Sequence, residues 1–201
     1  MSRYASRGAR AHPSRARAAN DTSEPSRLQT RRFAYADPPY PGKAFYYRGH
    51  PDYRGEVDHG ALLARLAGYD GWALSTSAQA LPQVLSLAVG HGLAVRVAAW
   101  LRGARPHTAA MFALNAWEPV VYVPVPARVR QVSRVDARRI DTLVHGVSPM
   151  LTLPGRVVGA KPAAFCRWVF DLMGATPADH LDDLFPGSGM VGRTWEAFVR
   201  S

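Results

Sequence analysis

The sequence predicts an α/β fold in which most strands of a single sheet run parallel. From residue 33 onward, short apolar segments alternate with segments of helical spacing, which is typical of strands joined by helices. The first and last strand candidates are each followed by an unusual turn, Asp37 with two prolines in one case and Gly-Ser-Gly (187–189) in the other. Ligands bind at the carboxyl ends of strands in such sheets. We therefore expect both turns to border one site.

The first half of the chain contains two strands and two helices in alternation. Residues 33–36 form an apolar run of strand length, and the spacing of three leucines predicts a helix over 61–67, which Gly68 ends. Residues 72–76 are the second strand candidate. Apolar residues on one face predict a second helix over 79–91, closed by glycines.

The second half adds three strands and two helices, the last of which begins after the Gly-Ser-Gly turn. Residues 93–100 and 119–125 are continuous apolar segments and predict strands. Phe165, Val169 and Leu172 form a stripe that predicts a helix over 161–173, before the last strand at 181–185. The domain organisation is a basic arm over 1–32, expected to be disordered, followed by one domain over 33–201.

The net charge of +10 is concentrated near the N-terminus. Residues 1–32 hold eight arginines against Asp21 and Glu24. Two functions fit this segment: an arm that binds phosphates, or a solubilising tail. No apolar run reaches the length of a membrane span, and the seven histidines are too scattered for a metal site, so we expect a cytoplasmic protein with neither membrane nor metal.

The turn after the last strand lies in "DDLFPGSGMVGRTWEAF" (182–198). Its glycines allow close backbone approach to a ligand, and the following helix offers free N–H groups. The segment lacks the glycine spacing of dinucleotide folds and the Gly-Lys-Ser/Thr of a phosphate loop, so nucleotide hydrolysis is not expected. The other turn, Asp37-Pro38-Pro39-Tyr40, would by itself suit a type I turn.

Together the two turns resemble a known family. "DPPY" (37–40) resembles the catalytic motif of amino-methyltransferases that act on adenine N6 or cytosine N4, and "DLFPGSG" (183–189) is similar to their S-adenosylmethionine (SAM) motif. "GAKPAAF" (159–165) matches the Lys-Pro signature before that motif, and "WEPVVYVPV" (117–125) is similar to an intervening strand. The catalytic motif comes first, which is the permuted order of the β-type enzymes. The resemblance implies a compact, Rossmann-like methyltransferase sheet.

The resemblance also implies roles for the residues of each motif. The target amine is a poor nucleophile because its lone pair is delocalised into the base ring. The carboxylate of Asp37 and the carbonyl of Pro38 would accept its two N–H groups and so draw the nitrogen toward a tetrahedral, nucleophilic geometry. Consecutive prolines stiffen this loop. Tyr40 would stack on a base flipped out of the helix. The predicted catalytic residues are Asp37, Pro38, Pro39 and Tyr40, and the predicted cofactor-binding residues are Lys161, Asp183, Phe185, Pro186, Gly187, Ser188 and Gly189.

Nucleic acid is the expected partner, with DNA favoured over RNA and adenine over cytosine. Residues 125–160 occupy the position of the family's target-recognition insertion. The same reaction on RNA or on cytosine N4 stays open, as does a nucleic-acid-binding subunit with weak catalysis. The arginines could hold phosphates without reading sequence, or lie solvated on the surface. The candidate phosphate contacts are Lys43, Arg48, Arg128, Arg130, Arg134, Arg138 and Arg139.

Several other residues have a structural role and a functional role to weigh. For Tyr46 and Tyr47 we favour packing over contact with a base, for His59 a cap or loop contact, and for Cys166 burial. Few residues follow Gly189, so the usual strands after the cofactor motif are expected to be missing. The strand at 181–185 would then lie near an open edge that pairs with a second copy, a partner subunit or the arm, and Glu196 could contact the cofactor ribose.

Overall fold

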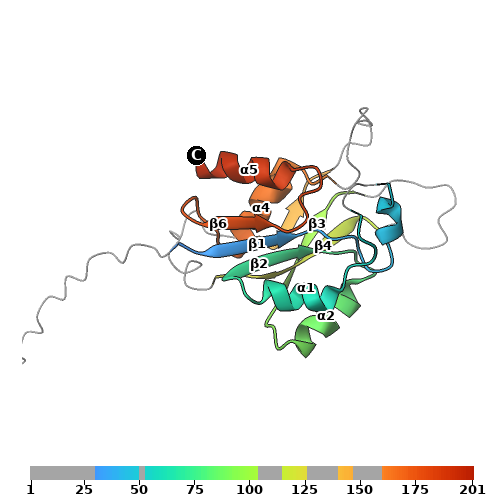
Figure 1. Ribbon diagram of the computed structural model, residues 1–201. Helices are drawn as coiled ribbons and strands as arrows, with labels where there is room; N and C mark the ends of the chain where they lie inside the picture. Colours follow the sequence, from blue (N-terminus) through green and yellow to red (C-terminus); the bar gives the residue numbers. More distant parts are fainter. Residues whose placement is uncertain (1–29, 50–52, 104–114, 126–139, 147–159) are drawn as a thin grey trace, which may run out of the picture.

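Six strands form one mixed sheet in the computed structural model of the protein, which describes residues 30–49, 53–103, 115–125, 140–146 and 160–201 (Figure 1). The order of the strands across the sheet is β5-β3-β4-β2-β1-β6. Their bounds are β1 (Arg32–Ala36), β2 (Gly71–Ser75), β3 (Arg96–Leu101), β4 (Trp117–Val123), β5 (Thr142–Val144) and β6 (His180–Asp183).

Strand direction sets which turns meet at each end of the sheet. β1 pairs in parallel with β2 on one side and β6 on the other, and β3 pairs in parallel with β5. β4 runs antiparallel to its neighbours β2 and β3. The carboxyl ends of five strands therefore lie at the same end of the sheet as the amino end of β4. The predicted α/β fold with strands mostly in one direction is confirmed.

Helices cover both faces of the sheet (Figure 1). Side chains alternate along β1, so Phe33 and Tyr35 enter the core beneath the last two helices, whereas Ala34 and Ala36 enter the core on the opposite face. No helix in the described part of the chain is long and apolar enough to span a membrane. The helices are α1 (His59–Leu66), α2 (Leu81–Gly90), α4 (Ala163–Met173), α5 (Met190–Val199) and the short 3-10 helix η1 (Ala44–Tyr47).

Local side-chain and backbone chemistry explains where the helices begin and end. Asp58 caps α1, because its Oδ1 accepts a hydrogen bond of 3.0 Å from the backbone N–H of Ala61. Before α2, the Ser77 Oγ accepts a hydrogen bond of 3.1 Å from the N–H of Ala80 in the preceding turn, and the helix, whose N-cap is Ala80, begins slightly later than predicted. Gly174 ends α4 with a φ of +82°, a conformation that glycine adopts without strain.

The sheet differs from the prediction in β5 and in the direction of β4. β5 has only three residues, which is too short an apolar run to be recognised, and it lies within the segment 125–160 that was assigned to target recognition. β4 carries four consecutive apolar residues, 120–123, whose pattern is the same in either direction. The pattern therefore predicts the strand but not its antiparallel orientation.

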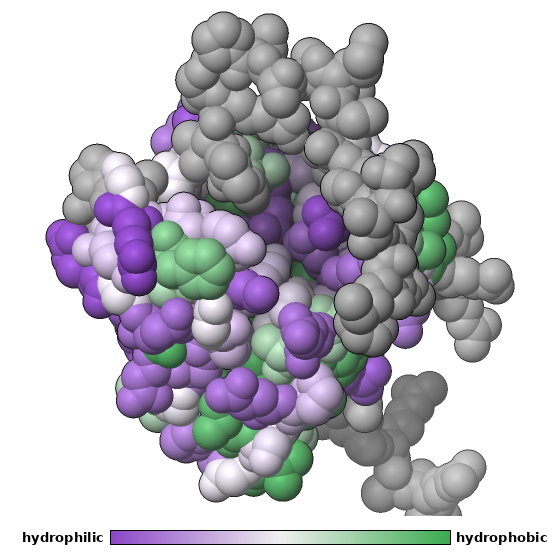
Figure 2. All heavy atoms as spheres, turned by 90° about the vertical axis from the view of Figure 1, so that its right-hand side faces the viewer, coloured by the Kyte–Doolittle hydropathy of each residue, from purple (hydrophilic) through white to green (hydrophobic). Residues whose placement is uncertain are grey.

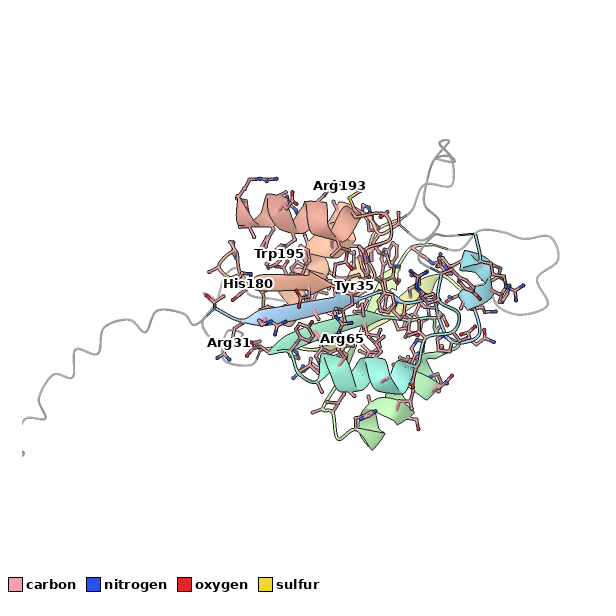
Figure 3. All side chains as sticks on the ribbon, in the orientation of Figure 1. Arg31, Tyr35, Arg65, His180, Arg193 and Trp195 are labelled. Carbon is pink, nitrogen blue, oxygen red and sulfur yellow. The ribbon has the colours of Figure 1, made fainter. Side chains whose placement is uncertain are left out.

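Arg31 and Arg32 belong to the folded part of the chain rather than to the basic arm, whose residues 1–29 lie outside the described residues. The guanidinium of Arg31 pairs with Asp70 at 2.7 Å and that of Arg32 with Asp182 at 3.0 Å. Asp179 also accepts a hydrogen bond from the backbone N–H of Arg31. Figure 3 shows Arg31 at the end of the sheet opposite η1. These two arginines therefore anchor the start of β1.

The strand of the predicted cofactor motif lies at an edge of the sheet. Within the described residues, β6 pairs with β1 on one side and has no strand on the other. The expected position of this strand is thus confirmed. That a second copy or a partner subunit pairs with this edge stays a prediction, which the mass of the purified protein in solution would test.

Candidate functional site

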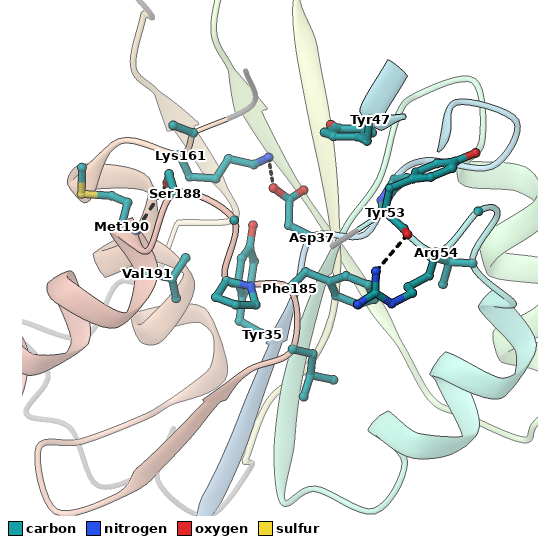
Figure 4. Close-up of a pocket in the computed structure, with 17 residues that line it drawn as sticks. Tyr35, Asp37, Tyr47, Tyr53, Arg54, Lys161, Phe185, Ser188, Met190 and Val191 are labelled. Carbon is teal, nitrogen blue, oxygen red and sulfur yellow. Dashed lines mark hydrogen bonds and ion pairs between the residues drawn. The ribbon is translucent and has the colours of Figure 1, made fainter. Parts of the chain in front are cut away.

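A pocket of about 490 Å³ opens where the carboxyl ends of β1 and β6 meet. Figure 2 shows this end of the molecule, where the surface is hollowed among polar side chains. The lining residues are Tyr35, Asp37 and Pro39 from β1 and its loop, Tyr47, Tyr53, Arg54, Gly55 and Val57 from the segment before α1, Ala160 and Lys161 before α4, and Leu184, Phe185, Pro186, Gly187, Ser188, Met190 and Val191 around the turn after β6 (Figure 4).

The two predicted motifs therefore meet in space. Asp37, which follows the last residue of β1, and Gly187 with Ser188 of the glycine turn line the same pocket. They are brought together because β1 and β6 are neighbouring parallel strands, with Tyr35 opposite Asp183 in the register. The 150 or so residues between them along the chain build the rest of the sheet.

An ion pair joins Asp37 to Lys161 inside the pocket. The Lys161 Nζ lies 2.6 Å from the Asp37 Oδ2, and the exposed fractions of the two side chains are 7% and 20% (Figure 4). Burial opposes the charge of Lys161, but the attraction of Asp37, and more weakly of Glu118, outweighs it and raises the pKa of the ammonium group. Lys161 is therefore a fixed cation that holds the Asp37 carboxylate in one orientation.

Tyr40 is anchored away from the pocket lining by a residue that the sequence analysis did not single out. Its hydroxyl donates a hydrogen bond of 3.1 Å to the Glu118 Oε2, and the Glu118 Oε1 pairs with the Arg102 Nε at 3.2 Å. Burial, then the charges of Asp37 and Glu118, raise the pKa of Tyr40 well above its ordinary value. The hydroxyl thus stays a donor, which fixes the ring. Pro38 is buried.

The turn after β6 has the open backbone that its glycines predict. Gly187 and Gly189 have φ values of +46° and +70°, which side-chain-bearing residues rarely adopt. The backbone N–H of Gly189 donates to the Pro186 carbonyl at 2.6 Å and closes the turn. Gly189 itself caps α5 and does not line the pocket, whereas residues 185–188 do.

Asp183 supports this turn from within the fold. Its Oδ1 accepts a hydrogen bond of 3.3 Å from the N–H of Phe185, and its Oδ2 is buried without a hydrogen-bond partner in the described part of the chain. Burial raises the pKa of this carboxyl group, and the negative charge of Asp37 adds to the effect. These contacts give Asp183 a role in ordering the turn.

The far wall of the pocket comes from residues that no motif predicted. Tyr47 ends η1, and Tyr53 with Arg54 follows it; the Arg54 guanidinium donates to the Tyr53 carbonyl at 3.0 Å. Burial, and next the charge of Asp37, raises the pKa of Tyr47. This stretch has neither regular periodicity nor a spacing associated with chemistry, and only its aromatic and basic composition could have pointed to a site.

The remaining predicted contacts fall in different places. Lys43 and Arg48 are exposed and flank η1 without lining the pocket. Glu196 is wrong as a ribose contact: its side chain is 67% exposed and pairs with Arg200, outside the pocket lining. The candidate contacts Arg128, Arg130, Arg134, Arg138 and Arg139 lie outside the described residues.

The structural roles weighed for the other residues are mostly upheld. His59 is buried and its Nδ1 lies 2.9 Å from the Val57 carbonyl oxygen, a loop contact, while the cap is Asp58. Burial raises the pKa of the Cys166 thiol to about 11, so it is no nucleophile at neutral pH. The preference for packing is wrong for Tyr46, whose side chain is 70% exposed, while Tyr47 is half-buried at the pocket.

No family model matches the chain, and no curated protein matches it in sequence. Among solved structures, the crystal structure of the M1.HpyAVI–SAM complex aligns with a TM-score of 0.53 at 15% sequence identity, over 84% of this chain and 79% of that chain. This likeness concerns the fold. The six-stranded sheet with helices on both faces is a Rossmann-like methyltransferase fold.

Proposed function

We propose that the protein is a SAM-dependent amino-methyltransferase that modifies the N6 amine of adenine in DNA. The observation that carries the proposal is the position of Asp37 and of the turn 187–188 on the walls of one pocket. A fold alone does not define an activity. The fold shared with M1.HpyAVI, whose structure is a complex with SAM, supports the choice of cofactor. The motif order supports the permuted type.

The residues present suit a ligand of this kind. A volume of about 490 Å³ lies within the range of pockets that hold small organic ligands. Phe185 offers an apolar surface, the open backbone at 187–188 admits close approach, and the buried Asp183 Oδ2 still lacks a partner in the described residues. When bound, SAM supplies a methyl group activated by attachment to a positively charged sulfur.

The chain's own contribution to the reaction is to hold and polarise the target amine. The Asp37 carboxylate would accept one N–H of the amine, and the Pro38 carbonyl the other, which favours a tetrahedral and more nucleophilic nitrogen. Lys161 holds this carboxylate in place, so the acceptor does not reorganise during the reaction. Asp37, the one carboxylate among the residues that line the pocket, would also take the proton that the amine loses once it is methylated.

Positive charge around the pocket supports a nucleic-acid substrate. Lys43 and Arg48 are exposed on either side of η1, and the net charge of the whole chain is +10. In this proposal they contact phosphates together with the arginines of segment 125–160 and the basic arm, and position the strand without reading its sequence. The protein's selectivity for a target sequence would then depend on few base contacts.

The proposal is tested by incubating the full chain with SAM that carries an isotopically labelled methyl group and with a mixture of DNA and RNA. Digestion to nucleosides and mass spectrometry identify the product. We expect label on N6-methyladenine from DNA. Label on N4-methylcytosine or only on RNA nucleosides would correct the substrate, and a complete absence of labelled nucleoside under all conditions would favour a binding protein that lacks turnover.

A further inference from the structure

An exposed pair of aromatic side chains lies beside the pocket. The side chains of Phe45 and Tyr46 are 45% and 70% exposed, and they are the only aromatic residues among the exposed large hydrophobic residues of the described chain. Their rings stack on one another with centroids 4.1 Å apart and an interplanar angle of 35°. We call Phe45 and Tyr46 the aromatic pair. Two neighbouring aromatic rings left in water mark an interaction site rather than part of the core.

The aromatic pair is held rigidly, although its rings are exposed. η1 is anchored by the fully buried Ala44, and the Glu56 carboxylate accepts hydrogen bonds from the backbone N–H groups of Gly42 (3.1 Å) and Ala44 (3.2 Å). The N–H of Lys43 donates to the Tyr40 carbonyl at 2.8 Å. The helix that carries the aromatic pair is therefore fixed to the loop that carries Asp37.

The aromatic pair continues directly into the pocket. The next residue, Tyr47, lines the pocket from η1 (Figure 4). A nucleic-acid strand that placed one base beside Asp37 would carry the neighbouring bases past η1. The aromatic pair lies close to Tyr47, because residues 45–47 belong to a single short 3-10 helix.

Charge around the aromatic pair selects the occupant. Lys43 precedes it and Arg48 follows it, both exposed, whereas the carboxylate of Glu56, which also lies at η1, is bound by the backbone N–H groups of Gly42 and Ala44. Interleaved aromatic and basic side chains suit a polyanion with flat, unpaired bases, since the rings stack on bases while the cations contact phosphates. An apolar protein partner would not require these flanking charges.

We infer that the aromatic pair stacks on unpaired bases beside the target base, and that the substrate is single-stranded nucleic acid. This rests on the proposed function, because the target base occupies the pocket at Asp37. In a duplex the bases already stack on one another, so their faces are closed to Phe45 and Tyr46. The aromatic pair would add affinity for the single strand without sequence preference, because every base offers a flat face.

Binding of a fluorescein-labelled oligonucleotide to the full chain, followed by anisotropy, tests this inference. We expect the single strand to bind more tightly than the duplex of the same sequence. Tyr46→Leu and Phe45→Leu should each weaken single-strand binding by about five- to a hundredfold, which corresponds to the loss of one stacked base. Tyr46→Phe keeps the ring and is the matched control, with affinity unchanged within about twofold.

Three outcomes would overturn the inference: equal affinity for duplex and single strand, unchanged binding by Tyr46→Leu, or equal loss in Tyr46→Phe and Tyr46→Leu. A dimer that dissociates in Tyr46→Leu would instead make the aromatic pair a contact between copies. The proposed function fails separately. If the Leu variants lose binding but wild type methylates nothing, base stacking by the aromatic pair is supported and the methyltransferase function is rejected. If wild type methylates nucleic acid and the Leu variants do so equally well, the methyltransferase function is supported and base stacking by the aromatic pair is rejected.

Discussion

Replacing Asp37 with asparagine is expected to lower methyl transfer by more than about a hundredfold, because the amine would lose a charged acceptor at the reacting nitrogen. The substitution keeps the size of the side chain and removes its negative charge. Single-turnover transfer of labelled methyl to an oligonucleotide measures the effect. The chemical step should slow, while the affinity for SAM changes little, since Asp37 itself is not among the predicted cofactor-binding residues, of which Lys161 and residues 185–188 line the pocket.

Asp37→Asn alone removes the carboxylate that pairs with Lys161, whose side chain is 7% exposed, so lost activity could reflect a loosened fold. The double variant Asp37→Asn/Lys161→Met separates the two effects, because it replaces the ion pair with neutral side chains of similar size. We expect the double variant to recover most of the thermal stability and none of the activity. Recovery of methyl transfer in that variant would remove Asp37 from the catalytic role.

The second large effect concerns stability. Removing one partner of a buried ion pair typically lowers the free energy of unfolding by 3–5 kcal/mol, and the 20% exposure of Asp37 places the expected loss near the lower end, about 3 kcal/mol for Lys161→Met. Urea unfolding of wild type, both single variants and the double variant completes the cycle. A coupling energy close to zero would mean that the ion pair does not hold the site together.

The pH dependence of this contribution has a definite sign. Burial alone would lower the pKa of Lys161, but Asp37 and Glu118 outweigh it, and the folded-state pKa lies above the ordinary value. The stabilisation is therefore complete below the ordinary lysine pKa of about 10.4 and is lost as the pH rises through the folded-state value. Wild type should lose stability in this alkaline range more steeply than Lys161→Met. Parallel curves for the two proteins would contradict the assignment.

Sequence patterns predicted the fold because its elements are local. The apolar run at 33–36 and the leucine spacing at 61–67 indicate a strand and a helix whatever their neighbours are, and their order indicates an α/β sheet. The direction of β4 depends instead on which strands it pairs with. Since that direction brings the start of β4 to the pocket end of the sheet, Glu118 could not be recognised as the partner of Tyr40.

The candidate site was predictable only where residue types with distinctive chemistry stand together. The acid with two prolines at 37–39 and the glycines of 187–189 mark two of its walls. Tyr47, Tyr53 and Arg54 complete it from a segment with no such pattern. The packing expected for Tyr46 failed because burial depends on the tertiary position of η1, which places this ring in water.

Calorimetric titration of SAM into the full chain tests the central claim most directly, with the variant Ser188→Trp as the comparison. The indole would fill space on the wall of the pocket that the turn at 185–188 forms. One saturable site in wild type, and its loss in a folded Ser188→Trp protein, is the predicted result. No heat of binding at high protein concentration, or unaltered binding by Ser188→Trp, would contradict a cofactor site between β1 and β6.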